Sequence, residues 1–426
     1  MNSPNVVPYD EHRIDVQKIS GNALTVLDTL NKAGFEAYLV GGGVRDLLLG
    51  QEPKDFDIST SASPDQIREL FRNCRLIGRR FRLAHILFGR EVIEVATFRA
   101  HHEQGEGGET EEESGRILRD NVFGTVEDDA IRRDFTINAL YYNAQDRTVI
   151  DYCGAMQDMQ SKTLRMIGES AVRCAEDPVR ALRAARFSAK LGFQVDQATR
   201  EAMAEKGRLL REIPPARLFE EVLKLFHSGH ACASFDRLRE FDLLQYLFPA
   251  ADRALKAGDD KFETFVSRAL ANTDERILSG KPVTPAFLYA VMLWPKTREL
   301  AMQYVAEEPP VPAVLMAADE ALAEQLQYTS LPKRFSIPTR EIWAMQPRLE
   351  CYIGKRALRL LSGPRFRAGY DFLCLRAGVS PELKERADWW TDIQQTHPHE
   401  VVRPEKKRTR TRKPRRTRNN QENTGA

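Results

Sequence analysis

The stretch Gly41–Asp46 (GGGVRD), followed by Asp55–Asp57 (DFD), decides the expected fold of this chain. Glu36–Val40 (EAYLV) predicts a short strand that runs into the glycines, and Lys54–Ile58 (KDFDI) predicts the next strand. Alternate residues of a strand point to the same face. The two aspartates are therefore expected to project together, while the phenylalanine between them points into a core.

A pair of carboxylates facing the backbone N–H groups of a glycine turn can hold two divalent cations and a triphosphate. This arrangement suggests phosphoryl or nucleotidyl transfer. Glycine favours it because glycine permits positive φ and a close approach of the backbone to phosphate oxygens. An Asp-x-Asp pair by itself also occurs in ordinary surface loops. The Walker pattern is absent because no Gly-Lys-Ser/Thr follows, and Asp46 breaks the dinucleotide-binding spacing.

Length and composition indicate a globular protein of several domains. The chain has 426 residues, of which 42% are hydrophobic. Its six cysteines form no Cys-x-x-Cys pair, so zinc and redox motifs are not expected. Scattered cysteines of this kind indicate a reducing, cytoplasmic location. No signal peptide is visible. The longest apolar run, Phe287–Trp294, is too short to span a bilayer, so no membrane insertion is expected.

The net charge of +2 conceals a strongly basic C-terminus. Residues 403–426 contain ten Lys or Arg and two Glu, a local charge of 10 − 2 = +8. The rest of the chain therefore carries 2 − 8 = −6. A basic tail on a mildly acidic body suggests a polyanionic partner.

The sequence predicts a mixed α/β head followed by helices. Residues 1–20 suggest a flexible arm, and residues 21–168 alternate short strands and helices. Residues 101–118, rich in Glu and Gly, predict a mobile loop in the head. The pattern is helical over 169–400, where Pro214-Pro215 opens one clear amphipathic helix. Residues 401–426 lack an apolar period and are expected to be disordered.

Two further acidic positions have open interpretations. Glu94 interrupts the apolar strand candidate Val92–Thr97, either as an edge residue or ion pair, or as a third carboxylate beside the aspartates. Asp134 follows Arg132 and Arg133, whose guanidinium groups suit phosphate oxygens. Asp134 is either a metal ligand or a residue that holds one of these two arginines, and the residues alone favour the salt bridge.

Glu176–Arg180 (EDPVR) predicts a helix start with Asp177 as N-cap and Pro178 at the first helical position. Arg180 would then lie near the carboxylate at the start of the helix. A carboxylate and a guanidinium together can accept from an exocyclic amino group and donate to a ring nitrogen. Such a pair would admit ATP and CTP, and it would leave unpaired polar groups against GTP and UTP.

Taken together, these motifs resemble the bacterial poly(A) polymerase and tRNA nucleotidyltransferase family of class II nucleotidyltransferases. The resemblance covers roughly residues 36–250, with the four motifs in the family's order. Leu76–Ile86 (LIGRRFRLAHI) is similar to the segment typical of the poly(A) polymerases, and Ile93–His102 and the basic tail also match that branch. The CCA-adding tRNA nucleotidyltransferases are the alternative within the family.

The resemblance implies a nucleotidyltransferase head with a mixed sheet over 21–168, a helical neck over 169–250 that binds the base and RNA, and a helical RNA-binding body and leg over 251–400. It implies template-independent transfer of AMP from ATP to RNA 3′ ends on two Mg²⁺, which promotes RNA decay. It also implies a monomer that contacts RNA-decay machinery and an RNA chaperone. A small-molecule nucleotidyltransferase and an RNA-binding protein with an inactive head remain as alternatives of other classes.

The resemblance also assigns residues to tasks. The metal ligands would be Asp55 and Asp57, and the third active-site acid would be Asp134, with Glu94 as its rival. The triphosphate site would be shaped by Gly41, Gly42, Arg45, Asp46 and Arg133. The nucleotide base would face Glu176, Asp177 and Arg180.

Removal of residues 403–426 is expected to weaken RNA binding without changing nucleotide choice. The tail's cations would release counterions from RNA, so truncation should also flatten the dependence of affinity on salt. Fluorescence anisotropy with a labelled RNA at several salt concentrations measures both quantities. An affinity and a salt dependence equal to those of the full chain would contradict the assignment of the tail to RNA.

Overall fold

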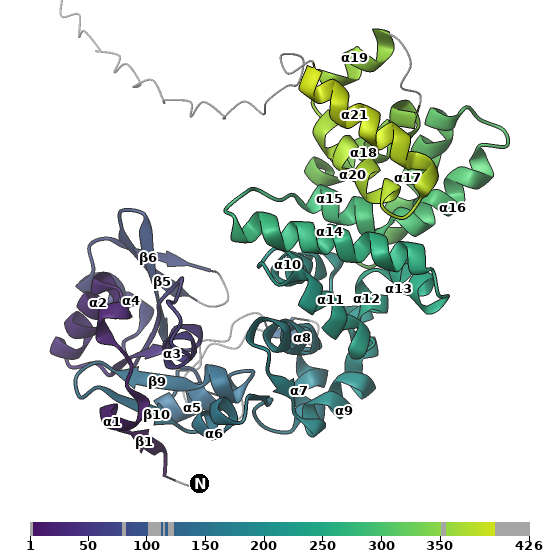
Figure 1. Ribbon diagram of the computed structural model, residues 1–426. Coiled ribbons are helices and arrows are strands. Elements are labelled where there is room, and N and C mark those ends of the chain that lie inside the picture. The colour runs from purple at the N-terminus through teal and green to yellow at the C-terminus, as the bar shows by residue number, and fades with distance from the viewer. Residues whose placement is uncertain are drawn as a thin grey trace, which may run out of the picture.

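The computed structural model describes residues 3–78, 82–100, 112–113, 116–117, 123–350 and 355–396. A sheet-containing head is followed by a helical neck and a helical body, which lies beyond the neck as seen from the head (Figure 1). The predicted basic tail lies outside the described residues. So does most of the predicted mobile loop over 101–118, of which only the paired strands β7 (Glu112–Glu113) and β8 (Arg116–Ile117) are described.

The head is built on an eight-stranded mixed sheet with the strand order β1-β10-β9-β2-β3-β6-β5-β4. Only β3 and β6 pair in parallel, and every other neighbouring pair is antiparallel. The strands are β1 (Asn5–Val7), β2 (Ala37–Val40), β3 (Asp57–Thr60), β4 (Cys74–Ile77), β5 (Leu83–Phe88), β6 (Glu91–Thr97), β9 (Leu140–Asn143) and β10 (Thr148–Asp151).

The period-two alternation of the strands separates an apolar face from a polar one. Helices α2 (Gly21–Lys32) and α4 (Pro64–Leu70) cover the apolar face, where residues such as Leu39, Ile58 and Val95 are fully buried. The residues between them point the opposite way. That second face carries Asp57 and Glu94, and beside them a smaller buried cluster that includes Val40 and Tyr141.

The N-terminal residues are part of the head, and the prediction of a flexible arm over 1–20 is wrong for the described residues 3–20. Strand β1 pairs with β10, and α1 (Tyr9–His12) and the turn Val16–Lys18 follow it. His12 accepts the Ile14 N–H at Nδ1 (3.0 Å) and contacts the Arg147 carbonyl through Nε2 (2.8 Å). This segment is mostly polar, and its few buried residues, such as Val7, Ile14 and Ile19, are too widely spaced to form a recognisable pattern.

The neck and body are helical, as predicted, and they share one hydrophobic cluster. The neck helices are α7 (Ser170–Glu176), α8 (Val179–Leu191), α9 (Gln197–Lys206), α10 (Pro215–Phe226), α11 (Ala231–Glu240) and α12 (Leu244–Leu247). The body helices are α13 (Pro249–Lys256), α14 (Asp260–Leu278), α15 (Pro285–Met292), α16 (Trp294–Tyr304), α17 (Pro310–Gln325), α18 (Lys333–Glu350), α19 (Lys355–Leu361), α20 (Phe366–Ala377) and α21 (Lys384–Thr396). Because α13 crosses residue 250 and the cluster continues through it, the predicted boundary there is not a break in the fold.

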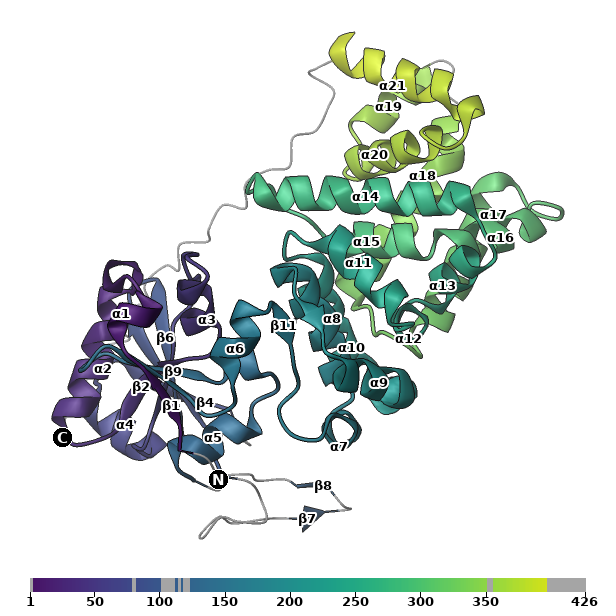
Figure 2. The same ribbon diagram turned by 60° about the horizontal axis from the view of Figure 1, so that its bottom comes forward.

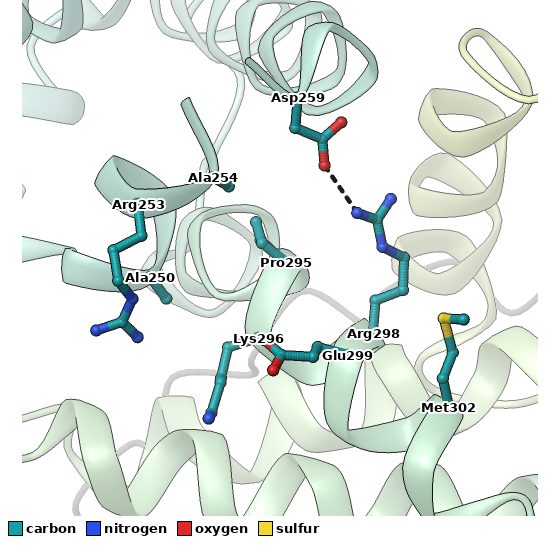
Figure 3. Close-up of a pocket in the computed structure, with 9 residues that line it drawn as sticks. All are labelled: Ala250, Arg253, Ala254, Asp259, Pro295, Lys296, Arg298, Glu299 and Met302. Carbon is teal, nitrogen blue, oxygen red and sulfur yellow. Dashed lines mark hydrogen bonds and ion pairs between the residues drawn. The ribbon is translucent and has the colours of Figure 1, made fainter. Parts of the chain in front are cut away.

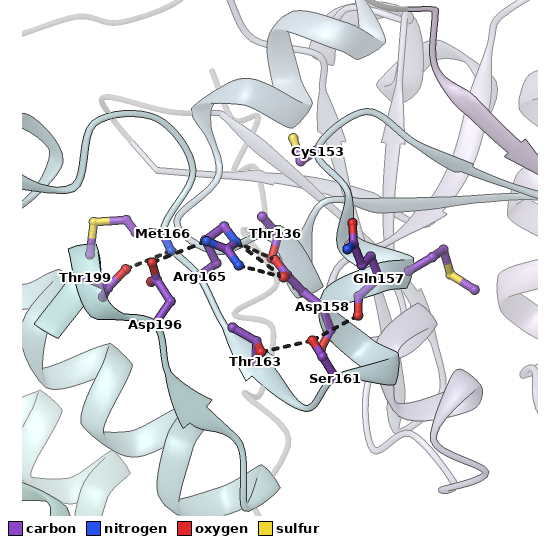
Figure 4. Close-up of polar contacts among 12 residues, drawn as sticks. Thr136, Cys153, Gln157, Asp158, Ser161, Thr163, Arg165, Met166, Asp196 and Thr199 are labelled. Atoms are coloured by element: carbon purple, nitrogen blue, oxygen red, sulfur yellow. Dashed lines mark hydrogen bonds and ion pairs between the residues drawn. The ribbon is translucent and has the colours of Figure 1, made fainter.

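A polar joint connects the head to the neck. Asp158 of α6 (Ala155–Gln160) accepts from the Thr136 hydroxyl (2.7 Å) and from Arg165, which also contacts Asp196 at 3.3 Å (Figure 4). Beside it, β11 (Thr163–Leu164) pairs in parallel with β12 (Gln194–Val195), and the second view shows the neck lying next to the head at this point (Figure 2). None of the helices in the described ranges has both the length and the apolar content that a membrane span requires.

Candidate active site

The glycine stretch forms a turn and the beginning of a helix. Strand β2 ends at Val40, Gly41 makes the turn with φ of 68°, and α3 (Gly42–Leu48) begins directly after it. A side chain at position 41 would be strained at this φ, and its Cβ would lie 3.2 Å from Arg133 Nη1. Only the first of the three glycines is therefore the predicted turn. The others place the open N–H groups of the first turn of α3 beside the acidic face.

The two aspartates follow the predicted alternation, although the strand begins later than predicted. Strand β3 starts at Asp57, so the prediction of a strand over Lys54–Ile58 is wrong and Asp55 lies in the preceding connection. Phe56 is 8% exposed and packs in the core, whereas both aspartates are exposed to solvent.

Glu94 lies directly beside Asp57. The two residues are partners in the parallel pairing of β3 with β6, and both point to the polar face of the sheet. Although Asp57 reaches solvent, partial desolvation by the surrounding protein raises its pKa to about 6, and the negative charges of Glu94 and Asp55 add to the shift while Arg133 opposes it. His85 of β5 approaches Glu94 from the other side, with Nε2 3.4 Å from Oε2.

These carboxylates suit a magnesium ion that is shared with a substrate. Among the described residues, neither Asp55 nor Asp57 has a hydrogen-bonded or ion-paired side-chain partner, and both side chains are exposed to solvent. No group of three His, Cys, Asp or Glu in the described part of the chain forms a preformed metal site. Mg²⁺ is commonly held by one or two carboxylates together with substrate phosphates, which fits this arrangement.

Asp134 is engaged on both carboxylate oxygens. Its Oδ2 pairs with Arg183 of α8 at 2.5 Å, and its Oδ1 accepts from the Phe135 N–H (2.9 Å) and from Asn138 Nδ2 (3.1 Å). Burial alone would raise the pKa of Asp134, but Arg183 and these hydrogen bonds lower it below the usual range. Asp134 therefore forms a salt bridge, as the residues alone favoured, but its partner is Arg183 of the neck and not the neighbouring Arg132 or Arg133.

Arg45 and Asp46 connect α3 to the neck. Arg45 is 3% exposed and donates to Asp46 Oδ1 (2.6 and 2.8 Å) and to Asn138 Oδ1 (2.6 Å). Its guanidinium also lies over the Phe187 ring, 5.4 Å from the centroid. The other oxygen of Asp46 contacts Lys190 of α8 at 3.3 Å. These two residues, predicted to shape the triphosphate site, are engaged with one another, with Asn138 and with Lys190.

Arg133, predicted to contact phosphates, is likewise committed to protein partners. Its Nε and both Nη atoms donate to Tyr141, Asp129, Ser59 and the Asn138 carbonyl. The pKa of Arg133 is raised because the Tyr141 and Asp129 groups outweigh the burial that would lower it.

The Glu176–Arg180 segment joins two helices at the edge of the neck. Glu176 ends α7, and its Oε2 accepts from Arg180 Nη1 at 2.9 Å. Asp177 accepts the Val179 N–H at the start of α8 (3.2 Å), and its other oxygen pairs with Arg217 of α10 at 2.7 Å. The predicted carboxylates and guanidinium are therefore neighbours, held by one another and by Arg217.

The sequence analysis missed several partners of the site, namely Asn138, Lys190 and Arg217. Lys190 could have been found from the sequence, because it lies seven residues after Arg183 and therefore on the same face of α8. Arg217 could not have been found in this way, since no local pattern connects residues 40 positions apart.

A separate cavity of about 480 Å³ lies in the body between α13 and α16 (Figure 3). It is lined by three cations, Arg253, Lys296 and Arg298, and each has a carboxylate partner. None of its lining residues belongs to the acidic site of the head, so it is not the place where the carboxylates act.

Comparison with known proteins agrees with this geometry. A family model described as "Poly A polymerase head domain" matches residues 37–165, and models described as "Probable RNA and SrmB-binding site of polymerase A" and "Polymerase A arginine-rich C-terminus" match residues 192–255 and 306–423. Poly(A) polymerase I of Salmonella typhimurium is 50% identical over 404 residues, covering 93% of this chain and 87% of that protein. Poly(A) polymerase I of Escherichia coli O6:H1 is 48% identical over 426 residues, covering 96% and 91%.

This chain belongs to the poly(A) polymerase family. Its enzyme class is that of a polynucleotide adenylyltransferase, which adds AMP to RNA 3′ ends.

Related enzymes of the wider family match less of the chain. The CCA-adding enzyme of Lactobacillus helveticus is 36% identical over 213 residues, covering 50% of this chain and 51% of that protein. Among solved structures, "The structure of CCA-adding enzyme apo form II" superposes with a TM-score of 0.61 at 22% identity, covering 92% and 87% of the two chains. The Bacillus stearothermophilus CCA-adding enzyme in complex with CTP superposes with a TM-score of 0.56 at 23% identity, covering 91% of this chain and 84% of that one. These structures share the fold.

Asp57→Asn is expected to be more stable to heat than the unchanged protein at neutral pH in metal-free buffer. Folded Asp57 keeps its proton up to a pKa of about 6, whereas an unfolded aspartate releases it near 3.8. Between these values the folded state binds more protons, so this group lowers the stability as pH rises through that window. Differential scanning fluorimetry should show a difference in Tm that is smallest near pH 4 and largest above pH 6.

The control is Asp65→Asn, because Asp65 is 56% exposed and takes part only in surface ion pairs with Arg68 and Arg82. Its change in stability should stay within about 0.5 kcal/mol at every pH. If the Tm of Asp57→Asn at pH 7 is lower than that of the unchanged protein, the claim that the charge of Asp57 destabilises the folded state is wrong.

Proposed function

We propose that this enzyme adds AMP from ATP to RNA 3′ ends without a template, using Mg²⁺ held at Asp55 and Asp57. The observation that carries the proposal is the placement of Asp57 beside Glu94 on one face of the sheet, with the exposed Asp55 two residues before Asp57. The chain's similarity favours this activity over CCA addition. Proteins named poly(A) polymerase I match more than nine tenths of the chain at 48–50% identity, whereas the CCA-adding enzyme of Lactobacillus helveticus matches half of it at 36%.

The metal-binding carboxylates would be Asp55 and Asp57, with Glu94 as the third acid in place of Asp134. Glu94 is supported by its pairing with Asp57, whereas Asp134 has both oxygens engaged by Arg183, Asn138 and the backbone. Bound Mg²⁺ would supply a lowered pKa for the RNA 3′-hydroxyl and neutralisation of the leaving phosphates.

In the proposed reaction the RNA 3′-oxygen forms a bond to the α-phosphorus of ATP. The bond from that phosphorus to the bridging oxygen breaks, and pyrophosphate leaves with the electron pair. The first-turn N–H groups of α3 would face the phosphates, because helix N-termini attract anions. Arg45 and Asp46 would hold α3 in place through Asn138 and Lys190.

The base would be read by Asp177 and Arg180. The Asp177 carboxylate can accept from the amino group of adenine, and Arg180 can donate to the neighbouring ring nitrogen. Glu176 would hold the Arg180 guanidinium in place, as it does here at 2.9 Å, and Arg217 would do the same for Asp177. The contribution to RNA decay and the contacts with decay machinery and an RNA chaperone remain predictions of the resemblance.

Three carboxylates are expected to be required for transfer, and Asp134 is expected to act differently from them. Asp55→Ala, Asp57→Ala and Glu94→Gln should each lower kcat by more than roughly 100-fold, since even an outer-shell partner of a metal ligand can cost that much. Asp134→Asn should instead raise KM for ATP more than it lowers kcat, because it releases Arg183 from its ion pair. Steady-state extension of a generic RNA with each of the four nucleotides measures these effects.

Circular dichroism of every variant controls for loss of fold. Near-normal kcat for Asp57→Ala would defeat the assignment of the metal site, and efficient CTP addition to a tRNA lacking its end would favour the CCA-adding alternative. A loss of kcat in Asp134→Asn equal to that in Glu94→Gln would return Asp134 to the role of third acid.

Arg180→Ala is expected to reduce the preference for ATP over GTP. The unpaired hydrogen-bonding group that GTP would leave costs about 1–3 kcal/mol, so selectivity should fall roughly fivefold to 150-fold. The ratio of kcat/KM values for the two nucleotides is the measurement. Arg237→Ala on α11, whose partner is the nearby Glu240, is the matched control. A selectivity that is the same in Arg180→Ala as in the control would exclude Arg180 from base recognition.

A further inference from the structure

A buried polar cluster lies on the same sheet face as the acidic residues. It consists of Ser59 of β3, Asp129 of α5 (Val126–Arg132), Arg133 just after α5, and Tyr141 of β9, and we call it the brace. Ser59, Asp129 and Tyr141 are 1%, 8% and 0% exposed. Polar side chains buried this deeply are costly unless they are fully hydrogen-bonded, so the cluster calls for a physical account.

The brace is hydrogen-bonded throughout and centred on one carboxylate oxygen. Asp129 Oδ2 accepts from Tyr141 Oη (2.7 Å), from Arg133 Nη2 (2.8 Å) and from Ser59 Oγ (3.4 Å). Arg133 in turn donates through Nε to Tyr141 Oη (2.9 Å) and through Nη2 to Ser59 Oγ (3.1 Å). Burial raises the pKa of Tyr141, which keeps its hydroxyl a donor. A satisfied network of this kind fixes the relative positions of the elements it joins.

Those elements are the ones that carry the site. Ser59 is two residues after Asp57 on β3, so both side chains point to the same face and the brace holds the strand directly beyond the catalytic carboxylate. Arg133 Nη1 donates to the Asn138 carbonyl (3.3 Å), and a Cβ at Gly41 would lie 3.2 Å from the same Nη1. The brace therefore bonds to the strand of Asp57 and lies beside the turn that begins α3, and Asn138, whose carbonyl it holds, accepts from Arg45 of α3.

Its charge also suits this location. Arg133 supplies a positive charge on the sheet face that carries Asp57 and Glu94, and it is bonded to Ser59 of the same strand as Asp57. Because Asp129 and Tyr141 hold the guanidinium, this positive charge stays at a fixed place behind the carboxylates instead of turning toward a phosphate.

We propose that the brace positions Asp57 relative to the Gly41 turn, so that the carboxylates and the phosphates of ATP can share a divalent cation. Asp129 and Tyr141 are then positioning residues for nucleotidyl transfer, acting through Arg133 and Ser59. This inference rests on the proposed function of Asp57 as a metal ligand.

The test compares Tyr141→Phe and Asp129→Asn with Tyr142→Phe. Tyr142 is the next residue of β9 and is equally buried on the opposite face, and within the described part of the chain its hydroxyl has no hydrogen-bond partner. Free Mn²⁺ is measured by electron paramagnetic resonance during titration of each protein with Mn²⁺ and a non-hydrolysable ATP analogue. The Mg²⁺ concentration for half-maximal AMP incorporation is measured on the same proteins.

Tyr141→Phe and Asp129→Asn should weaken Mn²⁺ binding roughly 10-fold to 100-fold, the range seen when partners of metal ligands are removed, and should raise the required Mg²⁺ in parallel. Tyr142→Phe should match the unchanged protein. If Asp129→Asn fails to fold, Ser59→Ala together with Tyr141→Phe decides the matter, with the same expected direction.

The inference is overturned if Tyr141→Phe and Ser59→Ala lower Tm but leave Mn²⁺ affinity and the Mg²⁺ requirement unchanged, since the brace would then be structural only. This result is distinct from failure of the proposed function, in which the unchanged protein would incorporate no AMP in the presence of Mg²⁺.

Discussion

The parallel pairing of β3 with β6 is the constraint on which the site depends, because it places Asp57 and Glu94 side by side on one face. Like charges at this separation repel, and partial desolvation together with the negative charge of Glu94 raises the pKa of Asp57. An isolated loop would relieve the repulsion by moving apart. Strand β3 cannot move apart from β6 in this way, because it lies in the middle of an eight-stranded sheet and packs on α2. The carboxylates therefore stay available to a cation.

Several charged residues of the family motifs serve this arrangement from within the protein. Arg45 and Arg133 are both buried and committed to protein acceptors, the former through Asp46 and Asn138 and the latter through Asp129 and Tyr141. A buried guanidinium with several acceptors is a rigid cross-link as well as a charge, because its planar donors fix the direction of each partner. The two motif arginines thus act in this structure on the backbone and side chains around the glycine turn and β3.

Helix α8 connects the catalytic head to the neck by charge. Arg183 pairs with Asp134 and Lys190 with Asp46, and Phe187 between them receives the guanidinium of Arg45. Asp177 and Arg180 stand at the N-terminal end of the same helix. The residues proposed to read the base are therefore held in register with the residues proposed to hold the phosphates by one rigid element.

The sequence by itself determined the mixed α/β head, the helical remainder and the alternation of Asp55, Phe56 and Asp57, because these follow from local periodicity and from glycine's backbone freedom. It did not determine that residues 3–20 join the sheet, that β3 begins at Asp57, or that Arg133 faces Asp129 and Tyr141. Those facts depend on which strands become neighbours and which side chains then meet in the interior. The neighbour of Asp57 could be identified only from the fold. The pairing of β3 with β6 brings Glu94 beside Asp57, 37 positions away in the sequence, whereas Asp134 forms an ion pair with Arg183 of the neck.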